Sequence, residues 1–71
     1  MYNFHVAQIG SIYQTGQKCP ESGVYRFFRH TDGSFCQPTQ AEYRIPLAKG
    51  DTFPPHRRCQ KGVVWQLESY A

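Results

Sequence analysis

Short strand-like segments separated by turn residues run through this sequence. Turn residues such as Gly, Pro, Ser and Asp recur about every eight to twelve positions, a spacing typical of small β-meanders and barrels. Helical periodicity is missing, and the one helix-compatible stretch, PTQAEYR, is short and is followed closely by Pro46. We therefore predict an all-β fold with little or no helix, either a small single-domain meander or an SH3-like or ribbon-like barrel.

The strongest strand signal is GVYRFFRH, residues 23–30, which is rich in β-branched and aromatic side chains. The Asp-Gly pair that follows, at residues 32–33, predicts a hairpin turn with a return strand beginning at FCQ, residues 35–37. In EYRIPL, residues 42–47, the proline indicates an edge or bulged strand. Alternation predicts two further strands, YNFHVA at residues 2–7 and VVWQLE at residues 63–68.

The phase of these strands also predicts the core. Side chains two positions apart on a strand share a face, so Val63, Trp65 and Leu67 should pack together, with Trp65 as an anchor. The full predicted core is Val24, Tyr25, Phe27, Tyr43, Ile45, Leu47, Phe53, Val63, Trp65 and Leu67.

Length and composition bound the class of protein. A chain of 71 residues forms one domain, which we divide into an N-terminal strand or extension, residues 1–15, and a small β domain, residues 16–71. An aromatic content of 15% argues against disorder. A net charge of +3 permits an acidic partner without requiring one.

The expected location is cytoplasmic. No apolar run approaches the roughly 20 residues needed to span a bilayer, and the N-terminus lacks the basic and long apolar regions of a secretory signal. We expect no membrane association. The three cysteines are an odd number, and a cytosol keeps thiols reduced, so metal ligands or free thiols are favoured over disulfides.

The run GQKCPESGVYRF…IPLAKGDTFPPHRRCQKGVVWQL resembles a family of very short bacterial proteins. Their common skeleton is GxxxPxSGxY, then LxxGDxFP, then VxW, and the similarity covers about residues 16–67. One branch resembles the YjzC-like proteins, which look metal-free, and another is a zinc-ribbon-like branch with two knuckles. The resemblance informs the fold more than the activity.

In the zinc-ribbon-like branch, the two knuckles would fall on Phe27 with His30 and on His56 with Cys59. Phe27 cannot bind a metal, so the first knuckle is incomplete, and Cys36 is the candidate substitute. The possible ligand set is His30, Cys36, His56 and Cys59, matching the four ligands of structural zinc. The favoured alternative is a metal-free fold with no cofactor, in which Cys36 and Cys59 are small buried residues and the histidines are surface groups.

Catalysis is not expected. The one conceivable dyad joins Cys59 to His56 or His30, and the five acidic residues are scattered without pairing. The sequence has no phosphate-binding glycine loop, no GxSxG and no HExxH. We therefore predict a protein that is not an enzyme.

Binding is the favoured function. We predict a non-enzymatic binding or adaptor module for a protein partner or for self-association, because aromatic residues outside the core and arginines are what interface hot spots favour. The candidate interface is Tyr2, Phe4 and Phe28. The alternative is a module for single-stranded nucleic acid, in which basic side chains among aromatics hold phosphates. Its candidate residues are Arg26, Arg29, Arg57, Arg58 and Lys61.

Overall fold

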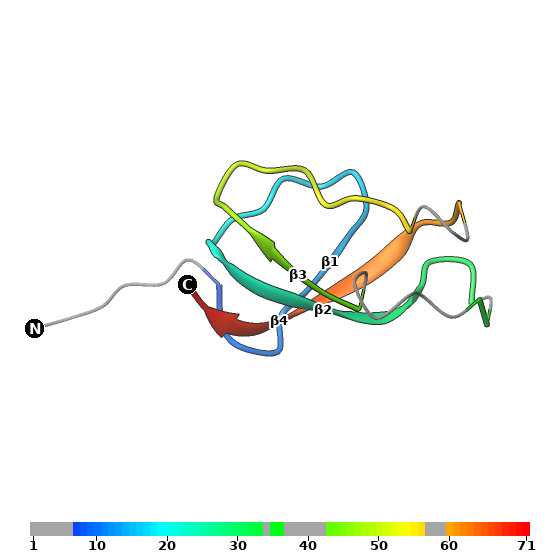
Figure 1. Ribbon diagram of the computed structural model, residues 1–71, viewed down its shortest axis with the longest axis horizontal. Helices are drawn as coiled ribbons and strands as arrows, with labels where there is room; N and C mark the ends of the chain where they lie inside the picture. Colours follow the sequence, from blue (N-terminus) through cyan, green and yellow to red (C-terminus); the bar gives the residue numbers. More distant parts are fainter. Residues whose placement is uncertain (1–6, 34, 37–42, 57–59) are drawn as a thin grey trace, which may run out of the picture.

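A computed structural model describes residues 7–33, 35–36, 43–56 and 60–71. Its named elements are four strands in one antiparallel sheet, with the order β1-β4-β2-β3 (Figure 1). The predicted all-β class is confirmed. Within the described residues there is no helix long and apolar enough to cross a membrane. The strands are β1 (Ile12–Gln14), β2 (Gly23–His30), β3 (Arg44–Leu47) and β4 (Val63–Tyr70).

The two long strands, β2 and β4, lie side by side at the centre of the sheet. The predicted strand at residues 23–30 has the bounds of β2, and β4 extends the predicted last strand to Tyr70. The short edge strand β1 was not predicted, and the predicted strand at residues 2–7 lies almost wholly outside the described residues. Pro46 is in β3, an edge strand, as its missing N–H requires.

The Asp-Gly turn after β2 is confirmed, but the return strand placed directly after it is wrong. Gly33 has a φ of 76° and its N–H donates to the His30 carbonyl at 3.1 Å, which closes the turn. Phe35 and Cys36 then lie outside the strands. The strands that pair with β2 come from later in the chain: β4 lies along one edge of β2, and β3 pairs with residues 23–26 on the other.

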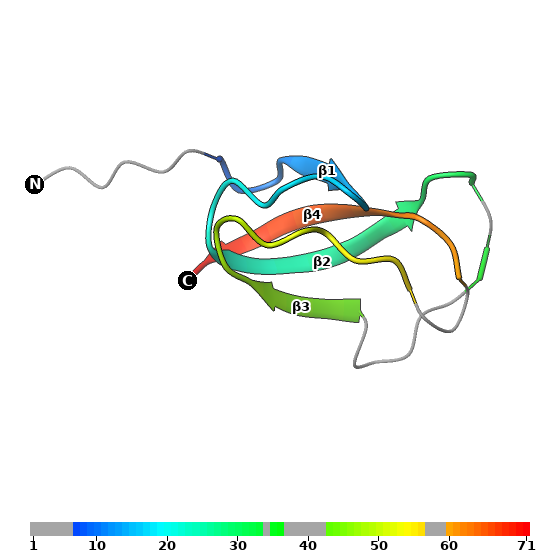
Figure 2. The same cartoon turned by 90° about the horizontal axis from the view of Figure 1, so that it is seen from above.

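Two loops cover one face of the sheet. Residues 15–22 and 48–56 cross the same side of β2 and β4, as Figures 1 and 2 show from two directions. Backbone hydrogen bonds join the loops to each other: Cys19 N–H donates to the Asp51 carbonyl at 2.6 Å, and Phe53 N–H donates to the Gln17 carbonyl at 2.9 Å. The predicted turn at residues 48–51 is also present, because Asp51 N–H donates to the Ala48 carbonyl at 2.9 Å.

The core lies between these loops and the covered face of the sheet. Tyr25 and Phe53 are fully buried, with ring centroids 4.9 Å apart, and Tyr13 stacks on Phe53 at 5.3 Å. Trp65 is buried and donates from Nε1 to the Pro54 carbonyl at 2.9 Å, so the predicted anchor is confirmed. The buried hydrophobic residues are Ala7, Cys19, Tyr25, Phe53, Val63, Val64, Trp65 and Leu67.

Two predicted core residues are corrected. Tyr43 is exposed, because it precedes edge strand β3 and only one side of that strand is covered by a neighbour. Val24 is only partly buried, since it alternates with Tyr25 and therefore faces away from the loops. Phe27, Ile45 and Leu47 pack against the core while keeping some exposure.

Candidate functional site

The sheet face opposite the loops carries a row of side chains across all four strands, which are polar on β2, β3 and β4 and apolar at Ile12 on β1. The register pairs Ile12 with Gln66, Gln66 with Arg26, and Arg26 with Arg44. These residues alternate along their strands with core residues, so they point away from the loops. We call this row, together with Glu68 on β4, the outer face.

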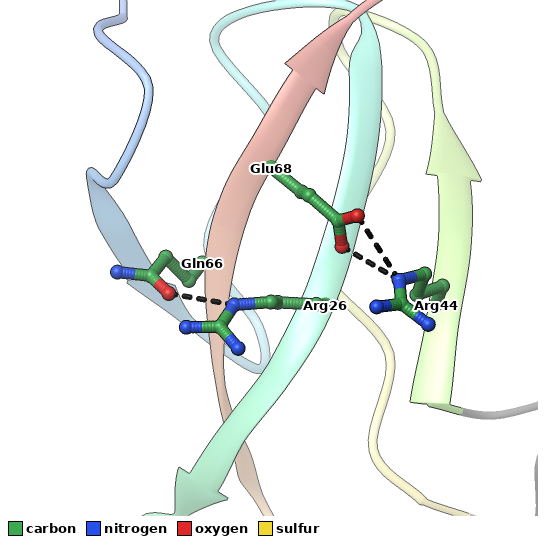
Figure 3. A network of polar contacts seen from close by, with 4 residues as sticks. All are labelled: Arg26, Arg44, Gln66 and Glu68. Carbon is green, nitrogen blue, oxygen red and sulfur yellow. Dashed lines mark hydrogen bonds and ion pairs between the residues drawn. The ribbon is translucent and has the colours of Figure 1, made fainter.

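Cross-strand contacts hold the arginines of the outer face in place (Figure 3). Arg26 Nε donates to Gln66 Oε1 at 2.8 Å, and Arg44 Nε donates to both carboxylate oxygens of Glu68, at 2.7 and 3.1 Å. Arg26 and Arg44 lie directly opposite each other on β2 and β3, and like charges in such a position destabilise a sheet. The contacts with Gln66 and Glu68 offset this repulsion.

Apolar side chains lie beside this polar row. Phe28 is 47% exposed and occurs where β2 has a bulge, two residues beyond Arg26. Ile12, at the β1 end of the row, is 51% exposed. Phe28 is thus accessible for binding, as its place in the predicted interface requires. Tyr2 and Phe4, the other predicted interface residues, lie outside the described residues.

The basic residues predicted to bind nucleic acid occupy different parts of the fold. Arg26 is on the outer face, Arg29 follows Phe28 on β2, and Lys61 lies before β4, where its Nζ is 3.0 Å from Asp32 Oδ2. Arg57 and Arg58 are not among the described residues. Sequence reasoning missed Arg44, Gln66 and Glu68 as partners of this surface, because cross-strand register carries no local sequence signal.

Two histidines meet at the end of the sheet where β2 finishes and β4 begins. His30 and His56 are 0% and 1% exposed, so their expected place on the surface is wrong. Their ring centroids are 5.2 Å apart, and Phe27 packs against both rings, at 5.1 and 4.9 Å. Trp65 lies 5.4 Å from His56. Their burial follows from ring packing, and we call these four side chains the histidine cluster.

Both ring nitrogens of His30 face carbonyl oxygens. Nδ1 is 3.1 Å from the Gly62 oxygen, and Nε2 is 2.6 Å from the Cys36 oxygen. A neutral imidazole has one N–H and therefore makes only one of these two contacts as a hydrogen bond.

The cysteines differ in their chemistry. Cys19 is a free, buried thiol, whereas Cys36 is disulfide-bonded, so the expected absence of disulfides is wrong for Cys36. The Asp-Gly turn is the structural reason that Cys36 lies beside His30, because it reverses the chain between them. Cys59 lies outside the described residues. The described part of the chain holds no group of three or more His, Cys, Asp or Glu side chains arranged for a metal ion.

The free thiol belongs to the core. Cys19 Sγ donates to the Tyr25 hydroxyl oxygen at 3.3 Å, and the Tyr25 hydroxyl donates to the Glu21 carbonyl at 2.7 Å. Burial raises the pKa of the Tyr25 phenol well above its ordinary value, and the contact with Cys19 raises it further. A buried thiol in such surroundings is a packing residue, not an activated nucleophile.

Together these features define a small antiparallel β-domain with one face closed by two loops and a histidine cluster at one end of its sheet. The profile of the YjzC-like protein family matches residues 10–66, and the chain belongs to this family. The comparison with curated proteins and the comparison with solved structures each return no match.

Proposed function

We propose that this protein is a small non-enzymatic binding module that recognises a partner protein through the outer face and Phe28. The observation that carries the proposal is the exposed aromatic ring at the β2 bulge, next to a row of ordered arginines. Aromatic and arginine side chains are enriched among the residues that dominate interface energies. An arginine already held by a neighbour also loses less side-chain entropy on binding.

The charge of the surface favours an acidic partner over a second copy of the chain. Among the described residues, Arg26, Arg29 and Arg44 lie on or beside the outer face, against one carboxylate, that of Glu68. A partner with an apolar anchor for Phe28 and carboxylates around it would complement this surface. Two copies meeting through the same face would bring the same excess of arginine together.

Capture on the immobilised full-length chain, followed by affinity measurement with the purified binder, tests the proposal. We expect Phe28→Ala to weaken binding at least about tenfold, the effect of losing roughly 1.4 kcal/mol. Phe35→Ala is the matched control, because Phe35 is 93% exposed but lies beyond the turn that follows β2. It should leave the affinity unchanged.

Salt separates this function from nucleic-acid binding. Binding through phosphates weakens steeply as salt rises, whereas an aromatic-centred interface should persist at about 0.5 M salt. The proposal is overturned if Phe28→Ala behaves like Phe35→Ala. It is also overturned if the double change Arg57→Ala, Arg58→Ala has the larger effect and the purified protein retains single-stranded RNA or DNA.

A further inference from the structure

We infer that Arg26 and Arg44 form a binding site for a phosphate monoester, carried by a phosphorylated side chain of the partner protein. This inference rests on the proposed function and names the acidic group that the outer face recognises. Three observations carry it: the place of the two arginines opposite each other, the way each guanidinium is held, and the direction in which the remaining donors point.

The first observation is the juxtaposition of two positive charges. Arg26 on β2 and Arg44 on β3 are direct partners in the antiparallel register, and both belong to the outer face. Residues in that position have Cβ atoms about 4.5–5.5 Å apart, and like charges there destabilise a sheet. Proteins break such local rules mainly at functional sites. An anion held between the two guanidinium groups would offset their repulsion, so the pair is suited to bind one.

The second observation is that each guanidinium is held through Nε alone. Arg26 Nε donates to Gln66 Oε1 at 2.8 Å, and Arg44 Nε donates to the nearer carboxylate oxygen of Glu68 at 2.7 Å. The guanidinium carbon of Arg44 also lies 5.3 Å from the centre of the Tyr43 ring. In the part of the chain that the structure describes, the Nη atoms of both arginines make no hydrogen bond. Each guanidinium is therefore oriented and keeps most of its N–H donors for a ligand.

The third observation is the direction of these donors. Both side chains lean the same way across the sheet, Arg26 toward β4 and Arg44 toward β2, with their Nη atoms on the side away from Glu68 (Figure 3). That side leads to the C-terminal end of β2, where Phe28 follows two residues beyond Arg26. Two N–H···O bonds of about 2.8 Å, one from each arginine, together span more than the roughly 4.8 Å between neighbouring strands. One anion can therefore reach both guanidinium groups.

The charge and the oxygen count favour a phosphate monoester over other anions. A phosphorylated side chain carries a charge of about −1.5 to −2 near pH 7 and three strong acceptor oxygens, enough for both arginines. A carboxylate brings one charge and two oxygens, which a single guanidinium fork satisfies. A phosphodiester of nucleic acid also brings one charge. Arginine clusters are a common means of recognising phosphorylated segments.

A single phosphate is compatible with the salt resistance expected of the interface. The salt dependence of nucleic-acid binding grows with the number of phosphates that are neutralised, so one phosphate adds only a shallow dependence. The phosphate supplies the part of the affinity that salt screens, and Phe28 supplies the part that persists.

Nuclear magnetic resonance titration of the isotope-labelled full-length chain tests the inference. The probe is phosphoserine with both ends blocked, so that the phosphate is its only charge. The reference probes, at matched ionic strength, are blocked glutamate and dimethyl phosphate. We expect saturable shifts of the Nε–Hε signals of Arg26 and Arg44 with phosphoserine, and an affinity about tenfold or more above that of either reference probe.

Variants decide whether the anion is at this pair. Arg26→Gln and Arg44→Gln each remove one guanidinium and should weaken phosphoserine binding about tenfold or more, the effect of losing charge-assisted hydrogen bonds. Lys61→Gln is the matched control, because it removes the same charge from a side chain that pairs with Asp32 before β4. It should change the affinity by less than about twofold, since distant surface charges are screened. Circular dichroism checks that each variant is folded.

Phosphatase treatment of the captured partner separates this inference from the proposed function. We expect the treated partner to bind about tenfold more weakly and to remain sensitive to Phe28→Ala. The inference is overturned, with the proposed function intact, if the treatment leaves a Phe28-dependent affinity unchanged.

Three other results are decisive. The inference is also wrong if phosphoserine leaves the arginine signals in place or binds no better than blocked glutamate. Tighter binding of dimethyl phosphate would favour nucleic acid and overturn both the inference and the proposed function. Arginine signals that respond to phosphoserine, with partner binding unaffected by Phe28→Ala, would keep the phosphate site and overturn the proposed function.

Discussion

The two faces of the sheet are built from the same strands and differ in almost every physical respect. On the covered face, Tyr25 and Trp65 are buried, and the ring of Phe53, from the covering loop, packs edge-on against that of Tyr25. On the outer face, the side chains one position along are arginine, glutamine and glutamate, joined by exposed contacts. The comparison teaches that apolar burial, which favours folding, is concentrated on one face, while the other face keeps its polar side chains in contact with water.

The largest expected effect on this difference between the faces comes from removing Trp65, the anchor of the covered face. Trp65→Ala should lower the free energy of unfolding by about 3–5 kcal/mol, because it leaves a cavity and removes the hydrogen bond from the indole to the Pro54 carbonyl. That is a large share of the roughly 5–15 kcal/mol available to a small domain. Urea denaturation followed by far-ultraviolet circular dichroism measures the loss.

Phe35→Ala is the control for that experiment, because an exposed aromatic away from special features changes stability by no more than about 0.5 kcal/mol. An unchanged urea midpoint in the Trp65 variant would show that the covered face does not hold the fold.

A smaller effect is expected at Tyr25, on the same face. Tyr25→Phe removes the hydrogen bond to the Glu21 carbonyl and should cost about 1–3 kcal/mol at neutral pH. The same residue should make the parent chain sensitive to alkali. Because the folded-state pKa of Tyr25 is raised, the unfolded chain releases this proton first, and stability falls as pH rises above about 10.

The alkaline effect is checked by comparing the urea midpoint at neutral pH with the midpoint at a pH above about 10. The Tyr25→Phe chain should lose less stability over that interval than the parent chain, since it lacks the titrating phenol. Equal losses in the two chains would assign the alkaline sensitivity to other groups.

The smallest effect should come from the outer face. Arg44 and Glu68 have side chains that are 58% and 36% exposed, so water and salt screen their ion pair. A double-mutant cycle with Arg44→Ala and Glu68→Ala should give a coupling of about 0.2–1 kcal/mol that shrinks as salt rises. A salt-independent coupling above about 2 kcal/mol would place part of the fold's stability on the outer face and remove the contrast.

Much of the fold was predictable because its signals are local. The eight residues of β2 have a dense β-branched and aromatic composition, the Asp-Gly pair specifies its turn, and Pro46 restricts its strand to an edge. Phase along β4 was enough to place Trp65 in the core. Each of these depends on chain neighbours alone, and each is seen in the structure.

The candidate sites were less predictable because they join segments far apart in the chain. The pairing of Arg44 with Glu68 spans 24 residues and that of Arg26 with Gln66 spans 40, so both depend on strand order and register. Strand β1 has only three residues, which is too short for an alternating pattern to be recognised in the sequence, and it is defined by its pairing with β4. The H-x-x-C spacing pointed to His56, but its burial beside His30 depends on how the loops close over the sheet.

The sequence by itself determined the all-β class, the central strands, the turns and the family, because periodicity, turn chemistry and short motifs act over a few residues. Only the tertiary structure decided which face of the sheet is open, which arginines are held there, and that two histidines are buried together. Those outcomes depend on non-local contacts, whose cost in chain entropy is offset only when the whole sheet and its covering loops form at once.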